Sequence, residues 1–170
     1  MSRTSTARRA APAPARSSLE GLSVGQLMGR ARSSLLAALD AALERFGLNG
    51  MQFAVLKHLA DGAAGTAADL CRLMHHDTGA MTRLVDRLEG SGLLRRERCR
   101  EDRRVVFLRL SAAGRAQLPR LRSLAGRVVE AHLAGFSPAE VEALKDYLGR
   151  MIDNGRSGAQ NHADPTGGKS

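Results

Sequence analysis

The sequence predicts a mainly α domain with one short strand pair, an α+β fold in which helices dominate. Apolar residues recur every three or four positions along most of the chain, as on the buried face of a helix. Two runs, residues 93–98 and 105–110, instead have the length and composition of paired strands, and the second places Val106, Leu108 and Leu110 on one side. With 170 residues, the chain is long enough to bury a core within one domain.

The two ends of the chain differ from its middle in composition. Residues 1–18 are rich in Arg, Ser, Ala and Pro and contain no acid, which predicts a disordered basic tail. A transit peptide has a similar composition, but Pro12 and Pro14 favour a disordered arm. Residues 155–170 are predicted as a second disordered tail, which leaves a domain over 19–154. No secretory signal and no apolar run of about 18 residues is present, so we expect a cytoplasmic protein that does not bind membranes.

Four helices are predicted before the strand pair. The first is long, over about 19–46, and its apolar stripe is Leu27, Met28, Ala31, Leu35, Leu39, Ala42 and Phe46. The second spans 51–59, and the third begins at Thr66, where Asp69 takes the usual place of Glu in a capping box. Asp77 caps the fourth, which ends at Gly90 and buries Met81, Leu84, Val85 and Leu88.

Two long helices follow the strand pair. Ser111 caps one that reaches Gly135, with Pro119 predicted to kink it or to mark a boundary. The sequence "SPAE" at Ser137–Glu140 opens the last helix, which runs to about residue 153. Short helices before a hairpin with a charged tip are typical of a winged helix-turn-helix, here with a DNA-binding part over 49–110. The terminal helices, about 19–46 and 112–153, have apolar stripes that need a partner, most simply a second copy.

The charge of the chain suits an anionic partner. The net charge is +9 and the sequence pI is about 11.1, a balance that favours nucleic acid, although solubility alone is the other interpretation. The chain has no Trp, one Tyr and four Phe, which argues against a platform that stacks single-stranded bases. Recognition of the grooves and backbone of duplex DNA therefore remains open.

The fourth helix and the hairpin tip both present arginines. The outer face of the helix carries Gly79, Arg83, Asp86 and Arg87, and the fork of Arg83 can pair with guanine O6 and N7. The alternative is a solvated face on which Asp86 bridges to Arg83 or Arg87. Residues 95–104 contain six arginines and three acids, and a hairpin tip can insert Arg into the minor groove. We expect Asp102 to hold the guanidinium of Arg104 in one rotamer.

These residues resemble those of the MarR family (multiple antibiotic resistance regulators). The resemblance rests on "TGAMTRLVDRLEGSGLLRRERCREDRRVVFLRLSAAGR", Thr78–Arg115, with its "TRLVDRLE" helix, "GLL.R" strand, "DRR" tip and "LS..G" helix start. It implies a homodimeric transcription factor, usually a repressor, that binds a palindromic double-stranded operator and is released by a small ligand, in many members an aromatic acid. The DNA-binding residues it implies are Thr78, Thr82, Arg83, Arg87, Arg100, Asp102, Arg103 and Arg104.

The effector site is less well defined by the sequence. In the family it lies among the first, second and fifth helices, where this chain offers Arg30, Ser34 and His58. A guanidinium can bind a carboxylate, and a histidine can gain or lose a proton near neutral pH, so Arg30, Ser34 and His58 are the candidate ligand-binding residues. The alternative is that Arg30 is simply solvated and His58 is an ordinary helix residue.

Other chemistry finds little support. Cys71 and His75 have i, i+4 spacing near His76, but no fourth ligand is evident, so no metal is expected. Cys99 lies among arginines, where oxidation is one interpretation and an incidental thiol the other. No nucleophile–base set or phosphate-binding loop is present, so we expect neither an enzyme nor a cofactor. The alternative function is non-specific or architectural DNA binding, which a low ratio of operator to random-DNA affinity would reveal.

Overall fold

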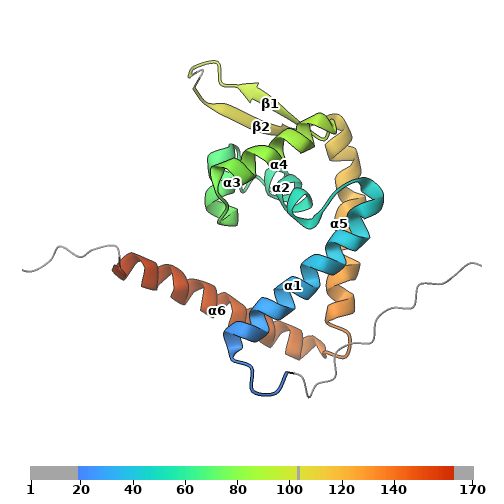
Figure 1. Ribbon diagram of the computed structural model, residues 1–170, viewed down its shortest axis with the longest axis vertical. Helices are drawn as coiled ribbons and strands as arrows, with labels where there is room; N and C mark the ends of the chain where they lie inside the picture. Colours follow the sequence, from blue (N-terminus) through green and yellow to red (C-terminus); the bar gives the residue numbers. More distant parts are fainter. Residues whose placement is uncertain (1–18, 103, 163–170) are drawn as a thin grey trace, which may run out of the picture.

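The computed structural model describes residues 19–102 and 104–162, which form a mainly helical domain with one strand hairpin (Figure 1). In chain order the elements are α1 (Val24–Leu43), the 3-10 turn η2 (Glu44–Phe46), α2 (Gly50–Ala60), α3 (Ala67–Met74), α4 (Thr78–Gly90), β1 (Leu94–Arg98), β2 (Val106–Leu110), α5 (Ala112–His132) and α6 (Pro138–His162). The predicted α+β class and element order are therefore confirmed.

Short polar side chains determine where the helices begin. At each start an oxygen of the capping side chain accepts the backbone N–H three residues later, an amide that the helix itself leaves without a partner. The capping residues are Ser23, Asn49, Thr66, Asp77, Ser111 and Ser137. The first helical segment ends at Gly47, whose φ of 66° lies in the left-handed region that glycine tolerates.

Three predicted boundaries are corrected. Helix α1 begins at Val24 and not near residue 19, because Ser23 and Gln26 form a reciprocal capping box. Helix α5 passes through Pro119 and ends at His132; Pro119 is exposed, so water can solvate the carbonyl that loses its partner. Helix α6 continues to His162, beyond the tail predicted from 155, because propagating an established helix adds one hydrogen bond per residue. The tail regions 1–18 and 163–170 lie outside the described residues.

The hairpin is short and is tied to the helices on both sides. Strands β1 and β2 pair antiparallel from Leu94↔Leu110 to Arg98↔Val106. The N–H of Leu108 donates to the carbonyl of Gly65 at 2.8 Å, and Thr66 forms a bridge with Phe107. The loop before α3 therefore extends the sheet by one short edge segment.

The core lies beneath α2, α3, α4 and the hairpin. Its most deeply buried side chains are Leu43, Val55, Leu56, Leu70, Met81, Val85, Leu88 and Leu121. The predicted inward face of the fourth helix is confirmed, since Met81, Val85 and Leu88 are buried and Leu84 packs against them. This core positions the outer face of α4 toward solvent.

The terminal helices are covered less well. Helix α1 packs against α5, whereas α6 extends away from the remainder of the chain (Figure 1). Large apolar side chains are left exposed on α1, α6 and the turn between α5 and α6, among them Val24, Met28, Phe136, Tyr147, Met151 and Ile152. Within residues 19–102 and 104–162, no helix has both the length and the apolarity that a membrane crossing requires.

Candidate nucleic-acid interface

The start of α4 is organised by its own polar side chains. Asp77 Oδ1 accepts the N–H of Ala80 at 2.8 Å, and Thr82 Oγ1 donates to the carbonyl of Thr78 at 2.8 Å. The hydrogen bond from Ala80, and more weakly the charge of Arg83, lower the pKa of Asp77. The first turn therefore holds a fixed carboxylate that keeps the helix start in place.

The two arginines on the outer face of α4 are not neutralised by the acids near them. Arg83 and Arg87 are exposed, and no carboxylate of the described residues lies within ion-pair distance of either. Asp86 instead contacts Arg96 of β1, with Oδ1 2.6 Å from Nη2. The alternative in which Asp86 bridges to Arg83 or Arg87 is therefore wrong, because the hairpin brings a third arginine closer.

Arg96 joins the hairpin to α4 through three contacts. Its guanidinium pairs with Asp86 and with Glu89, and its backbone N–H donates to Glu89 Oε1 at 3.1 Å. The hydrogen bond to Asp86 is the main cause that raises the pKa of Arg96. Sequence reasoning missed this cluster, although the i, i+3 spacing of Asp86 and Glu89 was a usable signal.

The hairpin tip is held by its backbone. The carboxylate of Asp102 accepts the backbone N–H of Arg104 at 2.9 Å, and the carbonyl of Asp102 accepts the N–H of Val105 at 3.0 Å. Asp102 and the guanidinium of Arg104 form no ion pair, so the predicted rotamer restraint is corrected. A short carboxylate reaches the amide two residues ahead without ordering a long side chain, which costs less entropy. Arg103 lies outside the described residues.

The acids of the hairpin are also engaged internally. Glu97 pairs with Arg95 at 2.6 Å and lies 3.7 Å from Arg109. The thiol of Cys99 donates to Glu101 Oε2 at 2.9 Å, which lowers the pKa of Glu101. Neither Glu97 nor Glu101 therefore forms an ion pair with Arg98, Arg100 or Arg104.

Among the described residues of α4 and the hairpin, five exposed arginines remain without an ion pair. We call them the arginine surface: Arg83, Arg87, Arg98, Arg100 and Arg104. They come from α4 and the hairpin, which are neighbours at one end of the molecule (Figure 1). Uncompensated guanidinium groups on adjacent elements can bind phosphates and base edges of a duplex.

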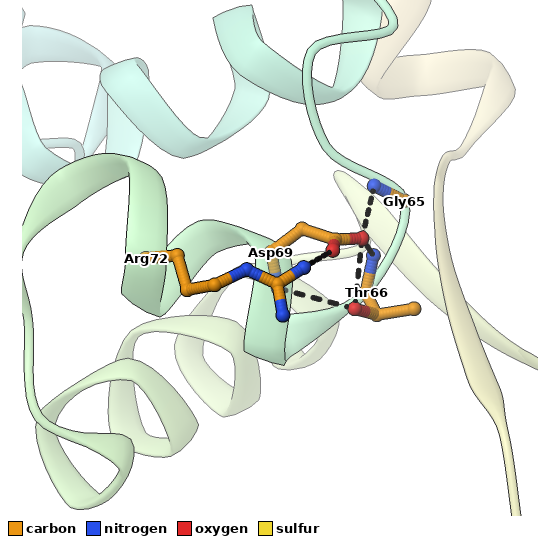
Figure 2. Close-up of polar contacts among 4 residues, drawn as sticks. All are labelled: Gly65, Thr66, Asp69 and Arg72. Atoms are coloured by element: carbon orange, nitrogen blue, oxygen red, sulfur yellow. Dashed lines mark hydrogen bonds and ion pairs between the residues drawn. The ribbon is translucent and has the colours of Figure 1, made fainter. Parts of the chain in front are cut away.

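The helix before α4 is anchored to the wing through its cap. Figure 2 shows Asp69 accepting from the N–H of Gly65 at 3.1 Å, and from the N–H and the hydroxyl of Thr66, both at 2.9 Å. The hydroxyl of Thr66 is the main cause that lowers the pKa of Asp69, and Arg72 also pairs with this carboxylate. Since the carbonyl of Gly65 accepts from Leu108, this cap connects α3 to β2.

A hollow of about 510 Å³ lies between α1, α2 and α5. Its wall is mostly apolar, with two cations and one acid at its edge: Leu35, Leu39, Phe53, Lys57, Asp61, Arg122, Ala125, Gly126, Val128 and Val129. Lys57 Nζ is 2.8 Å from Asp61, which also pairs with Arg122. The hydrogen bond from Lys57 is the main cause that lowers the pKa of Asp61.

The three predicted ligand-binding residues do not line this hollow. Ser34 Oγ lies 3.3 Å from His132 Nε2 of α5, and Arg30 is exposed on the first half of α1. His58 is half-buried on α2. Sequence reasoning missed Lys57, Asp61 and Arg122, of which only the i, i+4 pair of Lys57 and Asp61 could be recognised from spacing.

The cysteine–histidine group does not assemble into a metal site. His75 caps α3 in the left-handed conformation, with φ of 51°, so it no longer continues the helix of Cys71. Within 19–102 and 104–162, no three His, Cys, Asp or Glu side chains are grouped to hold a metal ion.

Comparison with known proteins identifies relatives of this arrangement. The MarR family model matches residues 46–105, which run from the last residue of η2 to the residue before β2. The transcriptional regulator MgrA of Staphylococcus aureus is 30% identical over 113 residues, 66% of this chain and 76% of MgrA. The uncharacterised regulator YdgJ of Bacillus subtilis is 33% identical over 87 residues, 51% of this chain and 53% of YdgJ, about half its length.

Solved structures share this architecture over most of the chain. A mutant MarR of Escherichia coli complexed with operator DNA superimposes with a TM-score of 0.69 at 25% identity, covering 76% of this chain and 93% of MarR. BpsR of Bordetella bronchiseptica, whose DNA binding is regulated by 6-hydroxynicotinic acid, gives 0.70 at 28% identity, over 79% and 96% of the two chains. The chain therefore belongs to the MarR family of winged helix-turn-helix DNA-binding transcriptional regulators, which are not enzymes.

Proposed function

We propose that the protein is a homodimeric repressor that binds a palindromic operator and leaves it when a small aromatic acid binds. The observation that carries the proposal is the arginine surface on α4 and the hairpin. Asp86, Glu89 and Glu97 pair with other arginines, so the guanidinium groups of the arginine surface are left free to contact DNA.

Each element of the surface has a separate task on the duplex. Arg83 and Arg87 on α4 read base edges in the major groove, with Thr78 and Thr82 at the helix start beside the phosphates. At the tip, Arg100, Arg103 and Arg104 contact the minor groove, and Asp102 keeps the turn closed through the amide of Arg104. The relative solved with operator DNA supports duplex DNA as the partner.

Dimerisation supplies the symmetry of the operator. The exposed apolar side chains of α1 and α6 would be covered by the same helices of a second copy. A two-fold dimer presents two recognition helices, so half-sites should be about one helical turn apart. Selection of operators from random DNA, followed by footprinting, tests this spacing.

The hollow between α1, α2 and α5 suits a small aromatic acid. Leu39, Phe53 and Val128 offer apolar wall for a ring, and Arg122 offers a guanidinium for a carboxylate. Such an anion competes with Asp61 for its cations. Because the hollow joins the terminal helices to α2, filling it can change the placement of the two recognition helices. BpsR, with its 6-hydroxynicotinic acid, supports this ligand class.

The DNA proposal is tested by the specificity ratio. We expect the selected operator to be bound roughly a thousandfold more tightly than random DNA at the same salt concentration. Equal affinities would identify an architectural DNA-binding protein instead.

The ligand proposal is tested by operator release with 6-hydroxynicotinate. Arg122→Gln should raise the concentration needed for release about tenfold, because it removes a charge-assisted hydrogen bond. Asp61→Asn should lower that concentration, because it removes the competing carboxylate. Arg120→Gln, on α5 outside the hollow, is the matched control. Equal release from all four proteins would refute this site.

A further inference from the structure

The contacts of Arg96 point to a role that differs from those of the arginines around it. We propose that Arg96 is a positioning residue that fixes the hairpin against α4, so that tip and helix reach the two grooves together. This inference rests on the proposed function, because it assumes that the hairpin tip contacts DNA.

The geometry constrains both distance and rotation. Asp86 and Glu89 lie three residues apart on α4, and the two ends of one planar guanidinium each contact one of them. The backbone N–H of Arg96 adds a third attachment, to Glu89 at 3.1 Å. A rigid fork held at two points and a backbone held at a third leave β1 little freedom to slide or turn along α4.

The hairpin needs such an attachment. A two-stranded sheet is marginally stable by itself. On the β2 side it is held by Gly65 and Thr66, whereas on the β1 side Arg96 supplies the polar contacts to α4 in the described part of the chain. The Arg96 side chain is 35% exposed, compared with 60% for its neighbour Arg95, which pairs only within the hairpin.

The cluster also removes a charge problem from the recognition helix. Asp86 lies between Arg83 and Arg87 in the sequence of α4 and is exposed. An unpaired carboxylate there would repel phosphates, but Arg96 neutralises it. Removal of the two acids should tighten DNA binding if their charge is what matters, and weaken it if their contact with Arg96 positions the hairpin. The sign of the change therefore separates the two effects.

The test uses the full-length protein on its selected operator. Arg96→Gln should lower operator affinity about tenfold, within the range of coupled interactions. It should also remove hydroxyl-radical protection of the flanking minor grooves, while guanine N7 protection in the major groove persists. Asp86→Asn with Glu89→Gln should do the same, although losing two negative charges would by itself tighten DNA binding. Arg95→Gln, on the adjacent position of β1, should retain flank protection.

Each contrary result has a distinct meaning. Tighter operator binding by the double carboxylate variant, or intact flank protection with Arg96→Gln, would overturn the positioning role. Absence of flank protection in the wild-type protein would overturn the proposed wing contact itself. If circular dichroism shows that Arg96→Gln does not fold, Arg96→Lys replaces it. Lysine keeps the charge but cannot bridge two carboxylates as a planar fork, so flank protection should weaken, and full protection would refute the proposal.

Discussion

The DNA-binding region and the terminal helices use apolar residues in opposite ways. Between α2 and β2 the large apolar side chains are mostly buried, and six of them, such as Leu56 and Met81, are almost inaccessible. On α6, Tyr147 and Ile152 are 59% and 56% exposed, and the helix extends away from the other elements (Figure 1).

This difference indicates that the DNA-binding region buries its apolar side chains within a single chain, whereas the terminal helices do not. Burial of apolar surface stabilises a fold by roughly 25 cal/mol per Å², and α6 gains little of it here. Exposed apolar side chains follow one another along α6, among them Leu148, Met151 and Ile152. We expect a second copy of the chain to cover them.

The largest effect is expected from a change on α6. Leu148→Glu with Ile152→Glu places charges in the apolar stripe, so the dimer should dissociate while the DNA-binding region stays folded. Operator affinity should fall about a hundredfold or more, because two linked half-site contacts become independent. Analytical ultracentrifugation and gel shifts measure both, and a tight-binding monomer would contradict the comparison.

A second change tests the contact between α5, a terminal helix, and the segment just before β1 of the DNA-binding region. At Gly114 of α5 an added Cβ would lie 2.1 Å from the carbonyl oxygen of Leu93, so Gly114→Ala forces the backbones apart. We expect a loss of about 1–3 kcal/mol in the free energy of unfolding. On the same helix Gly126 has open space around it, and Gly126→Ala should stabilise the protein by up to about 1 kcal/mol. If both variants had similar free energies of unfolding, the backbone of α5 could move away from Leu93 at little cost.

A third change lies within the DNA-binding region. Thr66→Ala removes the N-cap of α3 and the hydroxyl that contacts Asp69 (Figure 2), at a cost of about 1 kcal/mol in unfolding free energy. Chemical denaturation at fixed protein concentration measures it. The dimer should persist. A change in oligomeric state would show that the cap of α3 affects the terminal helices, against the comparison. Ser33→Ala on exposed α1 is the control.

The smallest effect is the pH dependence of the same cap. The pKa of Asp69 is lowered in the folded protein, so the ionised carboxylate stabilises the fold. This contribution is complete at neutral pH, declines as the pH falls below the ordinary carboxyl range, and is lost below the lowered pKa. The difference in unfolding free energy between wild type and Asp69→Asn should therefore shrink in acid. If the difference in unfolding free energy stayed constant with pH, the charge of Asp69 would make no contribution to the cap.

The candidate site was predictable in part. The family resemblance and the arginine pattern indicated α4 and the hairpin, and the capping residues Thr66 and Asp77 were recognised before the structure. The partners of the acidic side chains were not predictable from the sequence. Spacing along α4 offers Asp86 a bridge to Arg83 or Arg87 as an alternative, and spacing at the tip predicts Asp102 beside the guanidinium of Arg104. Arg96 and a backbone amide bind these acids instead.

The sequence by itself determined the order of the helices, most of their starts, the hairpin and the inward face of α4. These features depend on contacts between residues two to four positions apart, which spacing encodes directly. Only the tertiary structure decided that Arg96 joins Asp86 and Glu89, and that Asp61 lies between Lys57 and Arg122. Whether two long side chains meet depends on how helices and strands pack against one another, and several partners of the same charge are equally available along the chain.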